Sequence, residues 1–229
     1  MKVTTDACLF GSWVAQRISG LKKESITILD MGTGTGLLSL MVAQQNKNCH
    51  IEAVEVEEMA ASQANENVRA SPWQDLITVK CEDIREYKAE NKFDIIISNP
   101  PFYENELKSN DTGKNLAHHG EGLQLREVPE ILKKLLKKNG RFYLLLPFKR
   151  NEELKNLFLA HRLVIEEMTF VRQSVKHNFF RIMVAGSLQE KGNKKGTSET
   201  SLEELVIKDQ KDDYTPDFTR LLKDYYLYL

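Results

Sequence analysis

Four consecutive residues, Asn99, Pro100, Pro101 and Phe102, have the chemistry to hold a flat amino group. They follow residues 93–98, a short β-branched run that the prolines end, so the sequence predicts a buried strand with this tetrapeptide at its C-terminal end. The prolines restrict the backbone, which favours a fixed direction for the Asn99 amide oxygen and the Pro100 carbonyl oxygen. Both oxygens accept hydrogen bonds, and Phe102 can stack on a planar ring. A Pro-Pro turn after a strand is also compatible with a purely structural role.

A glycine-rich turn is the second feature with ligand-binding potential. Residues 28–31 predict a strand, and residues 37–43 predict an apolar helix after the turn. The turn has the spacing Asp-x-Gly-x-Gly-x-Gly, with its key positions at Asp30, Gly32, Gly34 and Gly36. This spacing differs from the dinucleotide fingerprint but keeps its strand, turn and helix context. We therefore expect close approach of the backbone to a ligand, with a dinucleotide not the first choice.

Acidic residues end the next two predicted strands. Residues 51–57 contain Glu55, which is placed to accept hydrogen bonds from both hydroxyls of a ribose. Residues 77–84 predict a third strand that ends at Asp83, which could accept a hydrogen bond from the exocyclic amine of adenine, with Ile84 beside it. Each acidic residue alone is typical of a solvated surface. Their recurrence at successive strand ends beside a glycine turn favours a nucleoside cofactor.

This ordered set of motifs resembles the Rossmann-like S-adenosylmethionine-dependent methyltransferases, and Asn-Pro-Pro-Phe resembles the catalytic motif of members that methylate amino groups. Further segments resemble the bacterial tRNA1(Val) adenine N6-methyltransferase family, at residues 2–7, 9–13, 66–73, 214–216 and 224–227. The resemblance covers nearly the whole chain. It implies S-adenosyl-L-methionine as the cofactor and adenosine 37 of a valine tRNA, beside the anticodon, as the substrate. His118 and His119 depart from the family pattern and are not included in the predicted site.

The expected mechanism is in-line transfer of the sulfonium methyl group to the adenine amine, with Asn99 and Pro100 accepting the two amine hydrogens. The predicted catalytic residues are Asn99, Pro100 and Phe102. The predicted cofactor-binding residues are Asp30, Gly32, Gly34, Gly36, Glu55, Asp83, Ile84 and Asn99. The predicted substrate-binding residues are Pro101, Phe102, Arg172, Lys176 and Arg181. We expect no metal in the site.

Other nitrogen substrates fit the same tetrapeptide. Enzymes that methylate glutamine in release factors share it, but they normally carry a helical domain for which there is no room before residue 26. Methylation of guanine N2 in ribosomal RNA or of adenine in DNA is closer chemically, yet neither explains the segments at the two ends of the chain. A non-catalytic RNA-binding module would be expected to lack the acceptor pair at Asn99 and Pro100, which is present.

Length and pattern predict a single α/β domain over residues 1–229. Alternating strands and helices favour a Rossmann-like, doubly wound and mostly parallel seven-stranded sheet with an antiparallel last strand. Residues 105–115 have no periodicity and are either a substrate loop or a disordered one. A flexible loop is expected near residues 189–200, followed by a C-terminal amphipathic helix within residues 218–228.

The formal net charge of −1 gives no global attraction to a polyanion, so RNA binding must depend on local basic groups. The lysines of residues 133–138 are expected on the solvated face of a helix. Arg172, Lys176 and Arg181 are better candidates for contact with the anticodon loop of a tRNA. Three scattered cysteines and the lack of a signal peptide or a membrane-spanning run favour a cytoplasmic protein, which we expect to be a monomer.

Overall fold

The computed structural model describes residues 3–21, 23–100, 123–189 and 199–228. Its strands are β1 (Ile26–Met31), β2 (Cys49–Glu55), β3 (Ile77–Cys81), β4 (Phe93–Ser98), β5 (Leu136–Pro147), β6 (Leu163–Ser174), β7 (Phe179–Leu188) and β8 (Ser201–Lys208). Its α-helices are α1 (Thr5–Ser19), α2 (Leu37–Gln45), α3 (Glu58–Arg69), α4 (Val128–Leu135), α5 (Asn151–Ala160) and α6 (Pro216–Leu222). The predicted loop at residues 105–115 lies outside the described residues, as do residues 190–198 of the second predicted loop.

The strands form one sheet with the order β3-β2-β1-β4-β5-β7-β6-β8. Strands β1 to β5 pair in parallel, and β7 runs antiparallel between β5 and β6. The chain order reverses between β1 and β4, so the carboxyl ends of these two neighbouring strands form the crevice where open α/β sheets bind ligands. The predicted Rossmann-like sheet, with an antiparallel strand in a mostly parallel arrangement, is confirmed.

The sheet has eight strands where the sequence predicts seven. The additional strand, β8, pairs in parallel with β6 at the edge of the sheet. Its first four residues are exposed, and this polar start hides the alternation that identifies a half-buried strand. The antiparallel strand β7 is therefore not the last strand of the chain.

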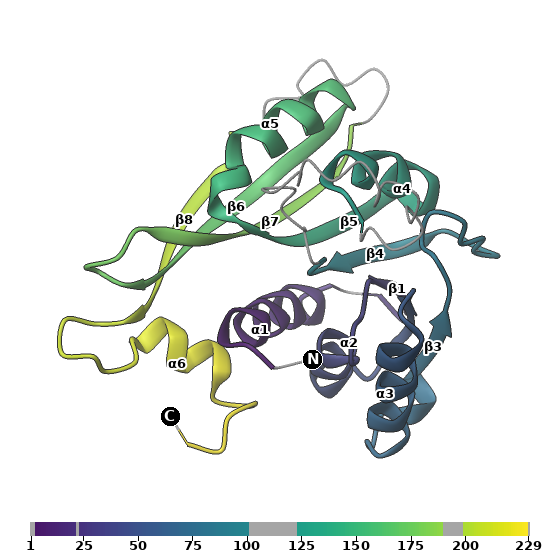
Figure 1. Cartoon of the computed structure of the whole chain (residues 1–229), viewed down its shortest axis with the longest axis horizontal. Helices are drawn as coiled ribbons and strands as arrows, with labels where there is room; N and C mark the ends of the chain where they lie inside the picture. The colour runs from purple at the N-terminus through teal and green to yellow at the C-terminus, as the bar shows by residue number, and fades with distance from the viewer. Residues whose placement is uncertain (1–2, 22, 101–122, 190–198, 229) are drawn as a thin grey trace, which may run out of the picture.

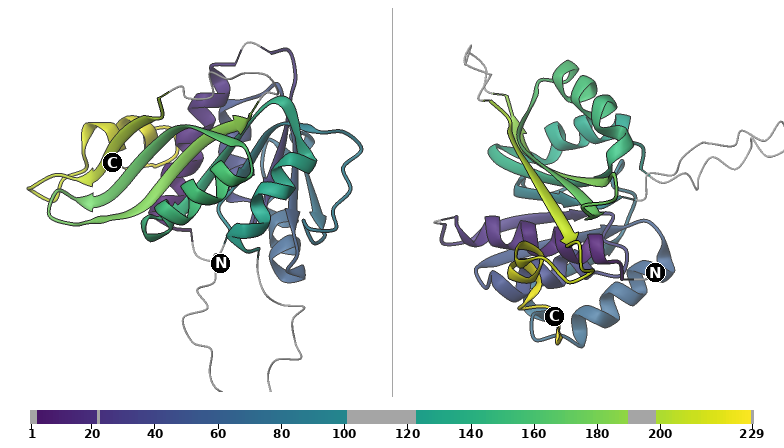
Figure 2. Two further views of the ribbon diagram at one scale, coloured as in Figure 1. Left: turned by 90° about the horizontal axis from the view of Figure 1, so that it is seen from above. Right: turned by 90° about the vertical axis from the view of Figure 1, so that its left-hand side faces the viewer.

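Helices cover both faces of the sheet, as Figures 1 and 2 show. On one face, α1, α2, α3 and α6 contribute to a core that we call the α1-side core. It includes Trp13, whose ring meets Tyr143 of β5 edge-on at 5.8 Å between centroids. On the other face, α4 and α5 contribute to a second core, the α5-side core, in which the rings of Phe142 and Phe158 meet edge-on at 5.4 Å between centroids. Among the described residues, no helix combines the length and apolar character needed to cross a membrane.

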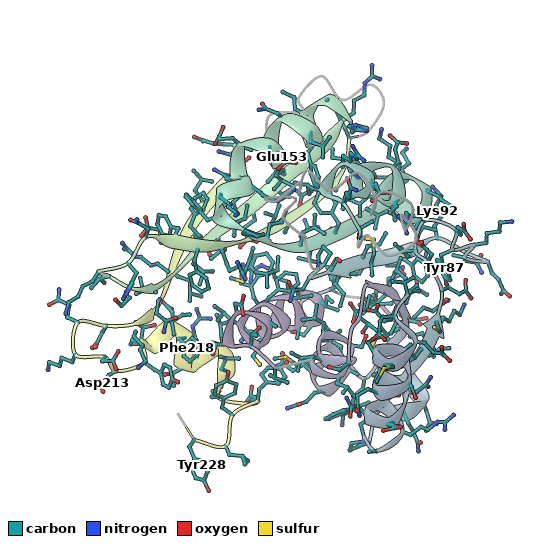
Figure 3. The ribbon with its side chains drawn as sticks, viewed as in Figure 1. Tyr87, Lys92, Glu153, Asp213, Phe218 and Tyr228 are labelled. Carbon is teal, nitrogen blue, oxygen red and sulfur yellow. The ribbon has the colours of Figure 1, made fainter. Side chains whose placement is uncertain are left out.

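The C-terminal segment returns to the N-terminal helix. Phe218 of α6 is fully buried in the α1-side core and stacks on Tyr214 at 4.6 Å (Figure 3). The Oγ of Ser12 in α1 donates a hydrogen bond to the carbonyl of Leu221. The predicted C-terminal helix is thus present but ends at Leu222, because the chain turns there to pack on α2.

The basic run at residues 133–138 is not one helical face. Helix α4 ends at Leu135 and β5 begins at Leu136, so Lys137 lies in a strand. There its Nζ donates to Asp94 at 3.0 Å. The prediction of a single solvated helix face was wrong because a strand begins inside the amphipathic pattern.

Candidate active site

A cavity of about 910 Å³ lies at the carboxyl ends of the parallel strands. Predicted site residues that line it are Gly32, Gly34, Glu55, Asp83, Ile84, Asn99, Pro100 and Arg181. They come from the glycine turn, from the ends of β2, β3 and β4, and from the start of β7. The start of α1 closes another wall with Thr4, Asp6 and Ala7. The fold thus brings cofactor and substrate candidates, far apart in sequence, to one site.

The glycine turn adopts a backbone that side chains rarely tolerate. Gly32, Gly34 and Gly36 have φ values of +73°, +58° and +86°, all in the left-handed region. The amides of Gly32 and Thr33 both donate to the carbonyl of Val54, at 2.9 and 3.0 Å, which ties the turn to β2. A Cβ at Gly32 would meet nothing within 4 Å. The turn therefore presents bare backbone to the cavity.

Asp30 lies behind this turn and is completely buried. Its Oδ2 accepts hydrogen bonds from the hydroxyls of Thr33 at 2.6 Å and Ser39 at 2.7 Å, which joins the turn to α2. Its Oδ1 has no hydrogen-bond partner among the described residues. Burial raises the pKa of Asp30 to about 6, although both hydroxyls act against that rise. Asp30 is absent from the cavity wall, so we interpret it as a residue that positions the turn.

Glu55 ends β2 and faces the cavity. Its Oε2 accepts from the amide of Gly34 at 2.8 Å, and its Oε1 accepts from the amides of Val56 and Glu57 at 2.9 and 3.0 Å. These bonds fix the carboxylate against the glycine turn. A carboxylate has about four acceptor positions, so these three bonds leave Glu55 about one position for a ligand hydroxyl.

Asp83 lies just beyond β3 and is paired with Arg85, which also lines the cavity and is not among the predicted site residues. The Arg85 Nε lies 2.9 Å from each carboxylate oxygen, and Nη2 lies 2.5 Å from Oδ2. The hydrogen bond from Arg85 lowers the pKa of Asp83 and outweighs the opposing effect of burial. An adenine amine would therefore share Asp83 with this guanidinium. Ile84 is 8% exposed and supplies an apolar wall beside them.

Asn99 and Pro100 follow β4 directly and both line the cavity. The Oγ of Ser98 donates to the carbonyl of Met31 at 2.5 Å, which ties the end of β4 to the end of β1. This bond holds the acceptor pair next to the glycine turn. Pro101 and Phe102 lie outside the described residues, so their predicted roles remain predictions.

The three basic residues predicted to bind substrate are in different surroundings. Arg181 lines the cavity and donates from Nε to Asp6 of α1 at 2.7 Å. Arg172 donates from Nη2 to Glu204 of β8 at 2.9 Å. Lys176 is exposed in the turn between β6 and β7. Of these three basic residues, Arg181 alone lines the cavity.

Comparison with known proteins identifies the family. The family model described as "Methyltransferase small domain" matches residues 15–171. A curated tRNA1(Val) (adenine(37)-N6)-methyltransferase from Flavobacterium johnsoniae is 35% identical over 229 residues, covering 99% of this chain and 93% of the relative. One from Tolumonas auensis is 36% identical over 99% of this chain and 90% of the relative. The chain belongs to the tRNA1(Val) (adenine(37)-N6)-methyltransferase family.

Solved structures agree with this family fold. A protein from Agrobacterium tumefaciens described as a predicted O-methyltransferase has a TM-score of 0.68 at 17% identity, with 97% of both chains covered. A SAM-dependent O-methyltransferase from Thermotoga maritima has a TM-score of 0.56 at 19% identity, covering 80% of this chain and 66% of that one. The family and the Rossmann-like fold predicted from the sequence are confirmed for this methyltransferase.

Proposed function

We propose that this methyltransferase transfers the methyl group of S-adenosyl-L-methionine to N6 of adenosine 37 in tRNA(Val). The observation that carries the proposal is the meeting of two features in one cavity. The glycine turn and Glu55 lie at the ends of β1 and β2, and the acceptor pair Asn99 and Pro100 lies at the end of the adjacent strand β4. The full-length similarity to curated enzymes named for this reaction supports the choice of substrate.

The charge of the cavity suits the proposed cofactor. The described walls carry five carboxylates, from Asp6, Glu55, Glu57, Glu82 and Asp83. They carry three basic side chains, from Arg85, Lys149 and Arg181. This excess of negative charge favours a ligand that bears a sulfonium and an ammonium group. A volume of about 910 Å³ lies at the upper end of the range for small-molecule pockets, roughly 300–1,000 Å³, which leaves room for a cofactor with a base beside it.

The chain offers a partner for each part of the cofactor. In this proposal the bare backbone of the glycine turn, between Gly32 and Gly34, contacts the amino-acid end. Glu55 accepts a hydrogen bond from a ribose hydroxyl, as the acid at the second strand end does in related folds. Asp83 and Ile84 border the adenine, through a hydrogen bond and an apolar contact. The bound cofactor supplies an electrophilic methyl group.

Asn99 and Pro100 act on the nitrogen that receives this methyl group. The lone pair of an exocyclic adenine amine is delocalised into the ring. When the Asn99 side-chain oxygen and the Pro100 carbonyl accept its two hydrogens, the nitrogen becomes more pyramidal and its lone pair becomes available. The two hydrogen bonds strengthen as positive charge develops on nitrogen, so they stabilise the transition state more than the bound substrate. The methylated nitrogen then loses a proton, and no general base is needed before transfer.

The substrate also fits an enzyme of this size. An adenosine in an anticodon loop is unpaired, which avoids the cost of a few kcal/mol for extruding a base from a duplex. The described residues of one chain line the cavity, so a single copy is sufficient in this proposal. A tRNA substrate places the activity in the cytoplasm.

The test is methyl transfer from labelled S-adenosylmethionine to total tRNA, followed by nucleoside analysis. Wild-type protein is expected to produce N6-methyladenosine. Asn99→Ala is expected to lower kcat about 100-fold to 1,000-fold, because it removes an acceptor that acts in the transition state, while equilibrium dialysis shows retained cofactor binding. Asn48→Ala, at an exposed position, is the matched control. Absence of N6-methyladenosine with wild type would refute the proposed function, and an active Asn99→Ala would refute the mechanism.

A further inference from the structure

Three phenylalanine rings form a cluster beside the cavity. Phe148 follows β5, Phe170 belongs to β6 and Phe179 begins β7. Their ring centroids lie 5.3 Å (Phe148 to Phe179), 5.5 Å (Phe170 to Phe179) and 5.7 Å (Phe148 to Phe170) apart. All three side chains keep part of their surface exposed, and Phe148 and Phe179 line the cavity wall. We call these three residues the phenylalanine cluster.

A β-bulge gives this cluster its position. In the pairing of β6 with β7, Val171 faces Arg181 and Arg172 faces Phe179, so Phe180 has no partner on β6. One extra residue in a strand redirects the side chains around it, and such bulges are common next to active sites. Here Phe180 packs against the α1-side core, while Phe179 joins Phe148 on the other side. Without the bulge, regular alternation would give Phe179 and Arg181 the same face.

An arginine completes the cluster. The guanidinium carbon of Arg172 lies 5.4 Å from the centroid of the Phe179 ring, within the range of a cation–π contact. Its Nη2 donates to Glu204, but its buried Nε has no hydrogen-bond partner among the described residues. A buried donor without a partner is unfavourable unless a ligand or water supplies an acceptor. The positive charge of Arg172 therefore lies against the Phe179 ring, which lines the cavity wall.

We propose that the phenylalanine cluster and Arg172 form a subsite for an unpaired nucleobase next to the target adenosine. This inference rests on the proposed function and specifies how the RNA is held. Strand β7 is two places from β4 in the sheet, so the cluster lies roughly 10 Å across the strands from the acceptor pair at Asn99. That separation suits a neighbouring nucleotide. Aromatic rings accept the π-face of any base, and the Arg172 guanidinium over the Phe179 ring adds a positive charge to this stacking surface.

The test combines a protein variant with a change in the RNA. The substrates are anticodon stem-loop RNAs, one intact and two lacking the base on the 5′ or the 3′ side of the target adenosine. With wild type, loss of the base at one of these positions is expected to raise KM about tenfold. Phe179→Leu is expected to raise KM about tenfold with intact RNA, and the same base removal then adds little. Cofactor affinity and kcat are expected to stay within about twofold.

A packing role would give a different result. If base removal at each position raises KM by the same factor in wild type and Phe179→Leu, the two changes are independent and the subsite is refuted. Phe158→Leu is the control, since Phe158 is fully buried in the same α5-side core away from the cavity wall. It is expected to lower Tm without any coupling to base removal. Coupling in that control would also refute the subsite.

The same RNAs distinguish the two proposals. Wild type that leaves the intact stem-loop unmethylated contradicts the proposed function. In that case the Kd of each RNA can be measured for wild type and for Phe179→Leu. The coupling between base removal and the substitution then still tests the subsite. If wild type methylates the intact RNA but base removal and Phe179→Leu show no coupling, the proposed function stands and the subsite is refuted.

Discussion

Replacing Asp30 with asparagine is expected to change how the stability of the protein depends on pH. Burial raises the pKa of Asp30 from its ordinary value of 3.8 to about 6, against the hydrogen bonds from Thr33 and Ser39. Because the folded-state pKa is the higher one, the folded protein binds more protons than the unfolded chain between about pH 4 and pH 6. Wild type therefore loses stability, relative to Asp30→Asn, as pH rises through this window. A difference of about 2 pH units corresponds to roughly 3 kcal/mol.

The assay is urea unfolding of wild type and Asp30→Asn at pH values from about 4 to about 8. The difference in unfolding free energy is expected to move in favour of the variant by roughly 3 kcal/mol up to about pH 7 and then to stay constant. Other titrating groups cancel in this difference when they are independent of Asp30. The absolute difference at one pH is not the test, because the new amide nitrogen at the Oδ1 position would be an unpaired buried donor that costs about 1–3 kcal/mol. A difference that is constant across the whole range would refute the raised pKa.

Three further predictions test other parts of the structure. Gly36→Ala is expected to lower the free energy of unfolding by about 1–2 kcal/mol, because the φ of +86° is unfavourable for a residue with a side chain. An unchanged free energy of unfolding in urea would contradict the left-handed conformation at this position. Asp94→Asn is expected to cost about 1–3 kcal/mol at pH 7. Burial acts to raise the pKa of Asp94, but hydrogen bonds led by that from Lys23 hold this pKa well below its usual range. The loss should therefore shrink gradually as pH falls from about 3.8 towards the lowered pKa. A loss that does not become smaller with each step of pH below about 3.8 would contradict the lowered pKa. Charge reversal of Arg172 and Lys176 to glutamate is expected to weaken tRNA binding and to lower the salt slope by about two in filter binding. An unchanged salt slope would show that neither side chain contacts an RNA phosphate.

Sequence pattern predicts the central part of this fold well. Strands β1 and β4 are buried on both faces, so they appear as largely apolar runs with clear ends at the glycine turn and at Pro100. Their order along the chain gives a parallel sheet, and the sheet brings the strand ends together. For the same reason Glu55 and Asp83 could be placed at the cavity from sequence. These predictions depend on short segments whose structure is determined locally.

Contacts between distant segments could not be predicted in this way. Asp6 and Arg181 are 175 residues apart in sequence, and their ion pair depends on how α1 packs beside β7. Arg85 is only two residues from Asp83, yet nothing in the sequence pattern indicates that its side chain turns back to that carboxylate. The bulge at Phe180 is a matter of register between two strands, and one inserted residue leaves no mark in an apolar run. Two consecutive phenylalanines at the start of a strand, Phe179 and Phe180, are the sequence feature that could have indicated this bulge.

The cavity also depends on residues that do not line it. Helix α1 supplies one wall through Asp6, and the C-terminal segment holds that helix in place. The Tyr225 hydroxyl donates to the carbonyl of Met41 at 3.0 Å, so the same segment is fixed to α2 behind the glycine turn. Next to α1, burial and the neighbouring Cys8 raise the pKa of Tyr226 to about 12, which keeps it a neutral hydrogen-bonding group. Helix α1 and the C-terminal segment therefore both determine the shape of the site.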